Sequence, residues 1–202
     1  MTIQQFMKPI VLSILGILLI LLCILGFNYS PNFNHASATS VGQKIDSLNG
    51  VYVFDNGGVS NVYGRNIAAD GYNLGLKYQC VEFVKRYYYE YYNHKMPDSY
   101  GHAKDFFDPK IADRKINKKR NLIQFSNPSF STPQINDILI FKGYLFNKFG
   151  HVAIVSKVTN NQIEIIQQNP GPFSSSREIY DLENKNEHWK IDNNRILGWL
   201  RK

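Results

Sequence analysis

The stretch "KYQCVEFVKRYYYEYY", residues 77–92, decides the fold because it predicts one amphipathic helix that begins at a cysteine, Cys80. Apolar and aromatic side chains follow the cysteine at helical spacing. They are Val84, Tyr87, Tyr88, Tyr91 and Tyr92. We expect these tyrosines to build the core, and a binding groove is the alternative.

Charged residues of the same helix predict its other face and its end. Glu82 with Arg86, and Arg86 with Glu90, have the spacing of favourable i,i+4 ion pairs. Asn93 and Pro97 then predict the end of the helix.

The second half of the chain has the pattern of strands. The segments are "DILIF" (137–141), "HVAIVSKV" (151–158), "QIEIIQQN" (162–169) and "RILGWLRK" (195–202). Before the helix, residues 49–59 predict a short β-rich stretch and residues 63–79 an ordered, glycine-rich loop. Residues 97–133 show little periodicity. One helix followed by several antiparallel strands predicts an α+β fold.

The composition excludes a disordered chain and indicates an anionic partner. Of the 202 residues 44% are hydrophobic and 14% aromatic, which suffices for a core, and the net charge is +7. The basic run 114–120 predicts a solvated loop, with attraction to an anionic wall polymer or lipid as the alternative. No nucleic-acid-binding motif accompanies the charge, so we expect no nucleic-acid partner.

The first residues predict export. Residues 9–27 are nineteen uncharged residues, which matches a transmembrane helix, with residues 1–8 in the cytoplasm. We expect a single-pass membrane protein with a linker at 28–44 and one extracellular domain at 45–202. Secretion after cleavage near Ala38, in the "ASA" triplet, is the alternative.

Export makes the cysteine at the helix start notable. Cys23 lies in the apolar run, which leaves Cys80 without a partner in an oxidising compartment. A helix N-terminus favours the thiolate and offers free amides to an oxyanion, so we expect Cys80 to be a nucleophile with a lowered pKa. A buried, inert cysteine is the alternative.

Of the five histidines, His151 is the candidate base because it begins an apolar strand after a glycine. Of the others, we expect His35 in the linker and His94 more than three helical turns from Cys80. His102 and His188 are expected in polar loops.

A catalytic imidazole needs an orienting partner, and the next strand offers Gln167 and Asn169, which alternation puts on one face. A two-residue turn at Asn160–Asn161 would direct His151 and Gln167 to opposite faces. A three-residue loop, 159–161, would place His151 opposite Asn169 with Gln167 on the same face. The catalytic interpretation needs the second register.

These motifs, in this order, resemble one known family. "YQCVEFVKRYYYE", "PQINDILIF", "GHVAIVSKV", "IIQQNPG" and "ILGWLRK" are similar to the cysteine, histidine-dependent amidohydrolase/peptidase (CHAP) domain. "QCVEF" also resembles the amidase part of glutathionylspermidine synthetase/amidase. The resemblance covers about residues 45–202 and implies a papain-like α+β fold, with the helix that carries Cys80 packed on an antiparallel sheet.

The resemblance implies Cys80 as nucleophile, His151 as general base, and Gln167 and Asn169 in the supporting positions. The family usually has glutamate where this chain has Gln167, while Asn169 matches; Asn136 replaces a common glycine. The implied function is extracellular hydrolysis of peptidoglycan amides, as an N-acetylmuramoyl-L-alanine amidase or endopeptidase, by a monomer without cofactor or metal. A catalytically weakened wall-binding or assembly module is the alternative.

Overall fold

The computed structural model describes residues 3–29, 40–172 and 174–202, with the side chains of 11–25 in the first helix. Its helices are α1 (Ile3–Tyr29), α2 (Cys80–Tyr92) and the 3-10 helix η2 (Ala103–Phe106). Its strands are β1 (Lys44–Leu48), β2 (Val51–Phe54), β3 (Arg65–Ile67), β4 (Asn73–Leu76), β5 (Lys115–Asn117), β6 (Leu122–Ser126), β7 (Ile138–Phe141), β8 (His151–Val158), β9 (Gln162–Ile166), β10 (Arg177–Lys185), β11 (His188–Ile191) and β12 (Ile196–Arg201).

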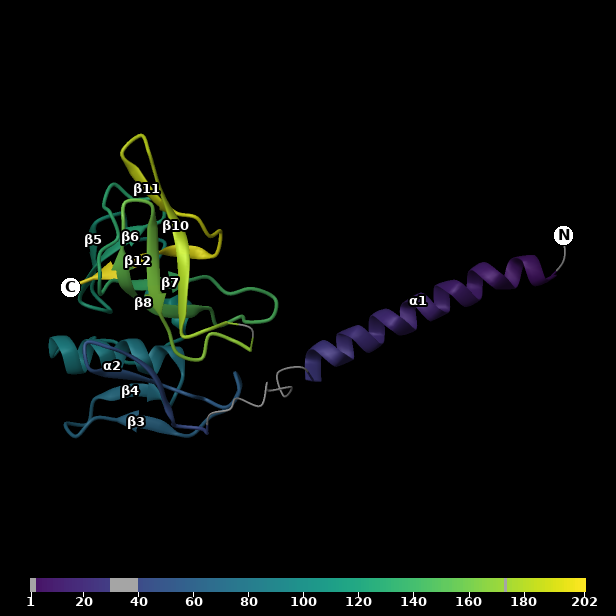
Figure 1. The fold of residues 1–202 in the computed structure, drawn as a ribbon, viewed down its shortest axis with the longest axis horizontal. Coiled ribbons are helices and arrows are strands. Elements are labelled where there is room, and N and C mark those ends of the chain that lie inside the picture. The colour runs from purple at the N-terminus through teal and green to yellow at the C-terminus, as the bar shows by residue number, and fades with distance from the viewer. Residues whose placement is uncertain (1–2, 30–39, 173) are drawn as a thin grey trace.

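The centre of the domain is one antiparallel sheet with the order β11-β10-β9-β8-β7-β12-β6-β5. The sheet curls, because Ser129, just after β6, pairs with Trp189 of the far strand β11. Two backbone bonds of 3.0 and 2.7 Å join them. Figure 1 shows α2 below this sheet, with β3 and β4 beneath the helix.

Alternation along β7 and β8 fills a core on each face of the sheet. Ile138, Ile140, Val152 and Ile154 belong to the core that includes α2. Their sequence neighbours belong to the second core, on the other face of the sheet, with Trp199. They are Leu139, Phe141, Ala153 and Val155. The expected α+β fold, with the cysteine helix packed on an antiparallel sheet, is confirmed.

The tyrosine-rich helix is anchored through its hydroxyl groups. Tyr87 and Tyr88 are buried, as predicted for core residues, whereas Tyr91 is 45% exposed and the prediction is wrong for it. Tyr87 donates to Oδ1 of Asn136 at 2.6 Å, and Tyr88 donates to the carbonyl of Asn136 at 2.8 Å. Asn136 has φ +77°, a left-handed conformation that asparagine tolerates, which explains how it replaces a glycine here.

The helix end and the ion pair of Glu82 with Arg86 were predicted correctly, whereas no ion pair joins Arg86 to Glu90 in the described residues. Asn93 caps α2 in a left-handed conformation. Glu82 and Arg86 form an ion pair of 2.6 Å that is buried rather than solvated. The reason is that β2 and β3 cover this face of α2.

The expected loop at 63–79 is wrong, because it contains the hairpin of β3 and β4. Glycine allows β4 to lie on the first turn of α2. Gly75 has φ +132°, and a Cβ there would be 3.2 Å from the Glu82 backbone. The weakly periodic segment 97–133 likewise contains η2, β5 and β6.

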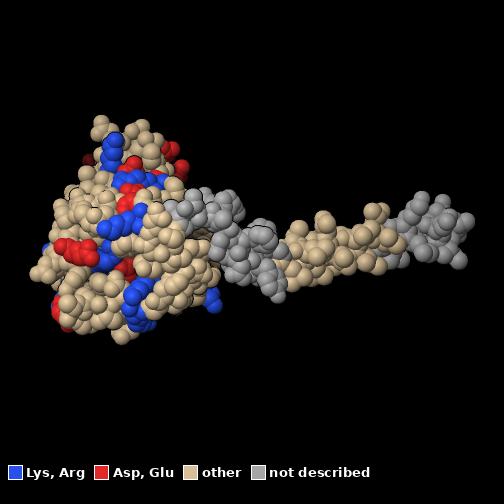
Figure 2. Space-filling view, turned by 60° about the horizontal axis from the view of Figure 1, so that its bottom comes forward, with Lys and Arg blue, Asp and Glu red and all other residues tan. Residues whose placement is uncertain are grey.

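The basic run 114–120 is not simply a solvated loop. It includes β5, and Arg120 at its end is only 1% exposed. Arg120 Nη1 donates to the Asp98 carbonyl at 2.6 Å, and its guanidinium lies 4.0 Å from the Phe106 ring. On the face drawn in Figure 2, basic and acidic residues are interspersed rather than gathered in one basic field.

The N-terminal segment forms α1, whose described side chains, including Cys23, are exposed. In the described part of the chain, the structure contains no helix with the length and hydropathy needed to cross a bilayer, so the expected span has no support there. The alternative cleavage point near Ala38 and His35 lie outside the described residues. Gly42, within the expected linker, already contacts the domain, because its amide donates to the Asp55 carbonyl at 2.8 Å.

Candidate active site

Cys80 is the first residue of α2, as the sequence predicts. Gln79, the N-cap, is extended, so the chain turns into the helix at the cysteine. The thiol interacts with backbone N–H groups of Cys80 and Val81, and with the backbone of Val152 in β8. Cys80 therefore lies against the strand that begins with His151, one residue before Val152.

His151 is 7% exposed, and its orienting partner is Gln167. His151 Nε2 and Gln167 Oε1 lie 2.9 Å apart. The amide orientation is fixed, because Gln167 Nε2 donates to the Ser175 carbonyl at 2.9 Å. Oε1 must then accept a hydrogen bond from Nε2–H, and Nδ1 of the neutral imidazole keeps the lone pair that a general base needs.

The register that brings these two residues together arises from a β-bulge. Thr159 and Gln162 pair across a two-residue turn, with the Thr159 amide 2.8 Å from the Gln162 carbonyl. The register then shifts at Ser156, so that Ile154 faces Ile166. The two-residue turn alone would separate His151 from Gln167, and the extra residue restores the catalytic register. The predicted register is thus confirmed beside His151, whereas the predicted three-residue loop is wrong.

Asn169 does not share the imidazole with Gln167. Its Nδ2 donates to Oε1 of Gln79 at 2.8 Å and to the Val59 carbonyl at 3.0 Å. Asn169 lies beyond the end of β9 with φ +52°, so the alternation of strand side chains no longer applies to it. The residue supports the start of the cysteine helix rather than the base.

Gln168, which the sequence analysis did not single out, completes this arrangement. It is 0% exposed, and its Nε2 donates to the Gln79 carbonyl at 3.0 Å and to Glu82 Oε2 at 2.8 Å. Its Oε1 accepts from the Phe54 amide at 2.8 Å. Consecutive residues after β9 thus hold the base (Gln167) and the first turn of α2 (Gln168 and Asn169).

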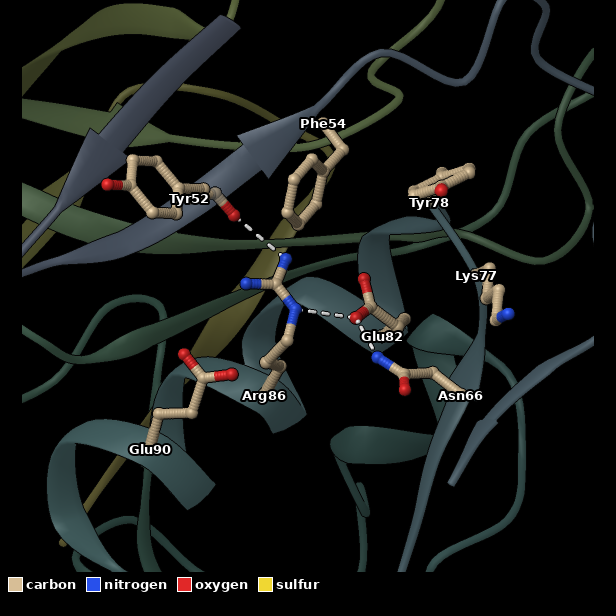
Figure 3. Close-up of a pocket in the computed structure, with 8 residues that line it drawn as sticks. All are labelled: Tyr52, Phe54, Asn66, Lys77, Tyr78, Glu82, Arg86 and Glu90. Atoms are coloured by element: carbon tan, nitrogen blue, oxygen red, sulfur yellow. Dashed lines mark hydrogen bonds and ion pairs between the residues drawn. The ribbon is translucent and has the colours of Figure 1, made fainter. Parts of the chain in front are cut away.

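Glu82, the partner of Gln168, also lines a pocket of about 310 Å³ on the side of α2 that faces β2 and β3 (Figure 3). Arg86 Nε donates to Glu82 Oε1 at 2.6 Å, and Asn66 donates to the same oxygen at 2.8 Å. Neither Cys80 nor His151 lines this pocket. Because Glu82 and Cys80 are two residues apart on a helix, they point to different faces. The pocket network therefore positions the helix without reaching the thiol.

Desolvation keeps both catalytic candidates neutral, although Cys80 is only partly buried by its surface exposure, whereas His151 is 7% exposed. Desolvation raises the pKa of the Cys80 thiol to about 11, although backbone hydrogen bonds at Val152, Val81 and Cys80 favour the thiolate. It also lowers the pKa of His151 to about 4, against the opposing effect of the Gln167 hydrogen bond. The expected lowering of the thiol pKa by the helix N-terminus is wrong for this resting state, because desolvation outweighs the amides.

In the described residues, no hydrogen bond joins Cys80 to His151. The ring of His151 is instead 5.8 Å from the Phe141 ring, centroid to centroid. Gly150 fixes where β8 begins, because it has φ +77° and a Cβ there would lie 2.5 Å from the Phe141 carbonyl oxygen. Hydrogen bonds between catalytic groups are often long in a ligand-free enzyme and tighten in the substrate complex.

The other described histidines have structural contacts. His94 Nε2 lies 2.9 Å from the Arg120 carbonyl oxygen, and it is buried. The His102 ring packs at a tilt against Phe149, with centroids 4.6 Å apart, and the His188 ring packs at a tilt against Phe130, with centroids 3.9 Å apart. This supports the choice of His151.

A helix headed by a cysteine, on an antiparallel sheet whose histidine is oriented by an amide, defines a site of the cysteine amidase and peptidase class. Residues 70–169, about half of the chain, match the family model described as the CHAP domain. The chain belongs to the CHAP domain family, and its domain is that of a hydrolase.

Curated relatives agree with this family. The chain is 30% identical over 148 residues to a bifunctional glutathionylspermidine synthetase/amidase of Escherichia coli (strain K12), covering 67% of this chain and 23% of the relative. It is 26% identical over 148 residues to a trypanothione synthetase of Crithidia fasciculata, covering 68% of this chain and 22% of the relative. The chain thus spans less than a quarter of the length of these relatives.

Proposed function

We propose that this domain hydrolyses an amide bond of cell-wall peptidoglycan, with Cys80 as nucleophile and His151 as general base. The observation that carries the proposal is the hydrogen bond of 2.9 Å between His151 and Gln167. It directs Nε2–H away from the reaction and leaves Nδ1 as the proton acceptor, while the thiol lies against the next residue of the same strand.

The neutral resting state defines the first step. As the Cys80 sulfur attacks the amide carbonyl, its proton passes to Nδ1 of His151, and the Gln167 carbonyl stabilises the imidazolium through Nε2–H. The amides of Cys80 and Val81 are placed to stabilise the oxyanion. The imidazolium then protonates the leaving amine, and a thioester forms. Water, deprotonated by His151, hydrolyses the thioester and releases the acid and the thiol.

The substrate class rests on the expected export of the chain. Nineteen uncharged residues near the N-terminus support an exported domain, for which peptidoglycan is the abundant amide polymer. The name of the E. coli relative supports a second candidate, the amide of glutathionylspermidine. Both substrates present an amide carbonyl to the same cysteine, so the choice between them is experimental.

A digestion experiment tests the activity and the substrate together. The purified chain is incubated separately with peptidoglycan and with glutathionylspermidine, and new termini are identified by mass spectrometry. We expect new amino and carboxyl termini in the peptidoglycan sample and none with Cys80→Ala or His151→Ala. The His188→Ala variant serves as the matched control and should retain most activity. Cleavage of glutathionylspermidine alone would contradict the wall substrate.

The alternative is a wall-binding module with little catalytic power, which is favoured by one observation, the amide of Gln167 where the family usually has a carboxylate. An amide stabilises the imidazolium less than a carboxylate does. Wall binding without new termini, unchanged by Cys80→Ala, would establish this alternative.

We also propose that the domain lies outside the cell, retained by its N-terminal segment. Protease treatment of intact cells should then degrade the domain, and fractionation should recover the chain with membranes. A mature N-terminus at Thr39 would show cleavage after Ala38 instead.

A further inference from the structure

The loop between β7 and β8, residues 142–150, exposes four large apolar side chains next to the start of the His151 strand. Tyr144 is 45% exposed, Leu145 88%, Phe146 66% and Phe149 47%. Among the described side chains, Leu145 is the most exposed large hydrophobic residue. We call these four residues the apolar tip. Isolated exposed apolar residues are common, whereas a contiguous group indicates an interaction surface.

The apolar tip has a defined conformation. The amide of Tyr144 donates to the Asn147 carbonyl at 2.9 Å, and the Asn147 amide donates back at 3.0 Å. Leu145 and Phe146 therefore occupy the apex of a tight turn. Asn147 Nδ2 also donates to the Gly150 carbonyl at 2.9 Å. Glycine, asparagine and aspartate are the residues that such an apex favours, so the turn itself does not require two large apolar ones.

Basic side chains surround the apolar tip. The Arg195 guanidinium lies 4.2 Å from the centre of the Tyr144 ring, and the Lys148 ammonium lies 5.3 Å from that of Phe149. Lys142 and Lys104 are exposed beside them; the Lys104 amide donates to the Phe149 carbonyl at 3.0 Å. Segment 142–150 contains no aspartate or glutamate. The surface is thus apolar at its apex and cationic around it.

We propose that the apolar tip inserts into the surface of a lipid bilayer that carries anionic headgroups. Leucine and aromatic side chains enter the boundary between headgroups and acyl chains, while lysine and arginine bind the phosphates. A projecting apex suits a bilayer, which yields to it, better than a rigid polymer. Because the loop leads directly into His151, insertion would hold the active site close to the membrane surface.

A tryptophan probe distinguishes this loop from any other part of the chain that associates with lipid. The full chain is prepared with Leu145→Trp and, as a matched control, with Ile116→Trp. Ile116 is 48% exposed and lies on the edge strand β5. Fluorescence above the background of Trp189 and Trp199 is recorded with vesicles of phosphatidylglycerol and phosphatidylcholine, or of phosphatidylcholine alone, with brominated acyl chains.

We expect emission from Leu145→Trp to shift to the blue and to be quenched by the anionic vesicles, and emission from Ile116→Trp to stay unchanged. Adding Lys142→Gln and Lys148→Gln to Leu145→Trp should weaken partitioning about 25-fold, since each basic residue near an anionic surface contributes about fivefold.

Three results would overturn the proposal. The first is no quenching at position 145 while the chain sediments with the vesicles. The second is equal quenching by neutral vesicles, or at position 116 as well. The third is a spectral shift with soluble peptidoglycan fragments and none with vesicles, which would make the apolar tip a substrate contact. The catalytic proposal does not depend on this outcome, because hydrolysis of soluble peptidoglycan fragments can be measured without lipid.

Discussion

His151 and Gln167 share a hydrogen bond of 2.9 Å although the turn between their strands would place them on opposite faces. The β-bulge at Ser156 supplies the missing residue, and Ser156 Oγ donates to Glu164 Oε1 at 2.7 Å. Deleting Ser156 would remove the bulge and direct Gln167 away from the imidazole. The register that joins His151 to Gln167 thus depends on one inserted residue in the middle of the hairpin.

Changing Gln167 tests the role of this contact. In Gln167→Leu the imidazole loses its acceptor, and we expect kcat to fall about 100-fold, the loss typical of a misplaced catalytic group. In Gln167→Glu the carboxylate would stabilise the imidazolium, so activity should be kept or raised and the acid limb of the pH–rate profile should move to higher pH. An acid limb at the same pH in Gln167→Glu would mean that residue 167 does not face the base.

The lowered pKa of His151 predicts a pH-dependent stability. The unfolded imidazole binds a proton below about 6.5, whereas the folded one does so only below about 4. Between these values the unfolded state binds more protons, so this contribution to stability is complete above about pH 6.5 and is lost as the pH falls toward 4. Urea unfolding from pH 7 to 4 should show a smaller decline for His151→Gln than for the wild type. Parallel curves would contradict a buried neutral imidazole.

A pair of glycine variants tests how the start of β8 is fixed. Gly150 and Gly64 both have φ +77°, but a Cβ would clash at 2.5 Å only at Gly150, and would meet nothing within 4 Å at Gly64. Gly64→Ala should cost about 1–2 kcal/mol from backbone strain alone. Gly150→Ala should lower the free energy of unfolding further and should also reduce activity, because His151 follows directly. If Gly150→Ala and Gly64→Ala lose the same amount of thermal stability and the same fraction of activity, the close approach of Gly150 to Phe141 does not matter.

Gln168 provides a test of how the cysteine helix is positioned. Gln168→Leu would leave the partly buried amide of Phe54 and one buried oxygen of Glu82 without their partner, so we expect a loss of about 1–3 kcal/mol in urea unfolding. Activity should fall more than for Gln162→Leu, a matched change whose hydrogen bond to Asp181 is exposed. A stability and activity profile like that of Gln162→Leu would contradict the positioning role.

Local patterns of the sequence predicted the elements whose periodicity was strong. The helix from Cys80 to Tyr92 and the strands of residues 138–141, 151–158 and 162–166 lie where expected. Short elements were missed because their stability comes from distant partners. The β3–β4 hairpin is built around glycine and pairs only three residues of β3, so that no alternation is visible.

The site was predicted as far as residue spacing could carry it. Gln167 faces His151 as the register argument required, but the bulge that produces this register left no recognisable signal. The role of Gln168 and the separate contacts of Asn169 depend on segments more than a hundred residues away, at Phe54 and Val59. The thiol pKa could not be predicted either, because the desolvation of the thiol at the head of α2 depends on how the surrounding segments pack.

Alkylation gives an independent measure of the thiol pKa. With a thiol pKa of about 11, the rate of Cys80 modification by iodoacetamide in the substrate-free chain should still be rising at pH 9. Mass spectrometry of the alkylated peptide across pH 6–10 measures this. A plateau below about pH 8.5 would show that the helix N-terminus outweighs desolvation after all.

The most direct test of the catalytic account is to trap the thioester on Cys80. The chain is mixed with an excess of a peptidoglycan peptide substrate, quenched in acid within the first turnover and digested for mass spectrometry. The account predicts an acyl adduct on the peptide that contains Cys80, absent from His151→Ala. Hydrolysis that proceeds in Cys80→Ala, or turnover by the wild type with an adduct at any other residue, would contradict it.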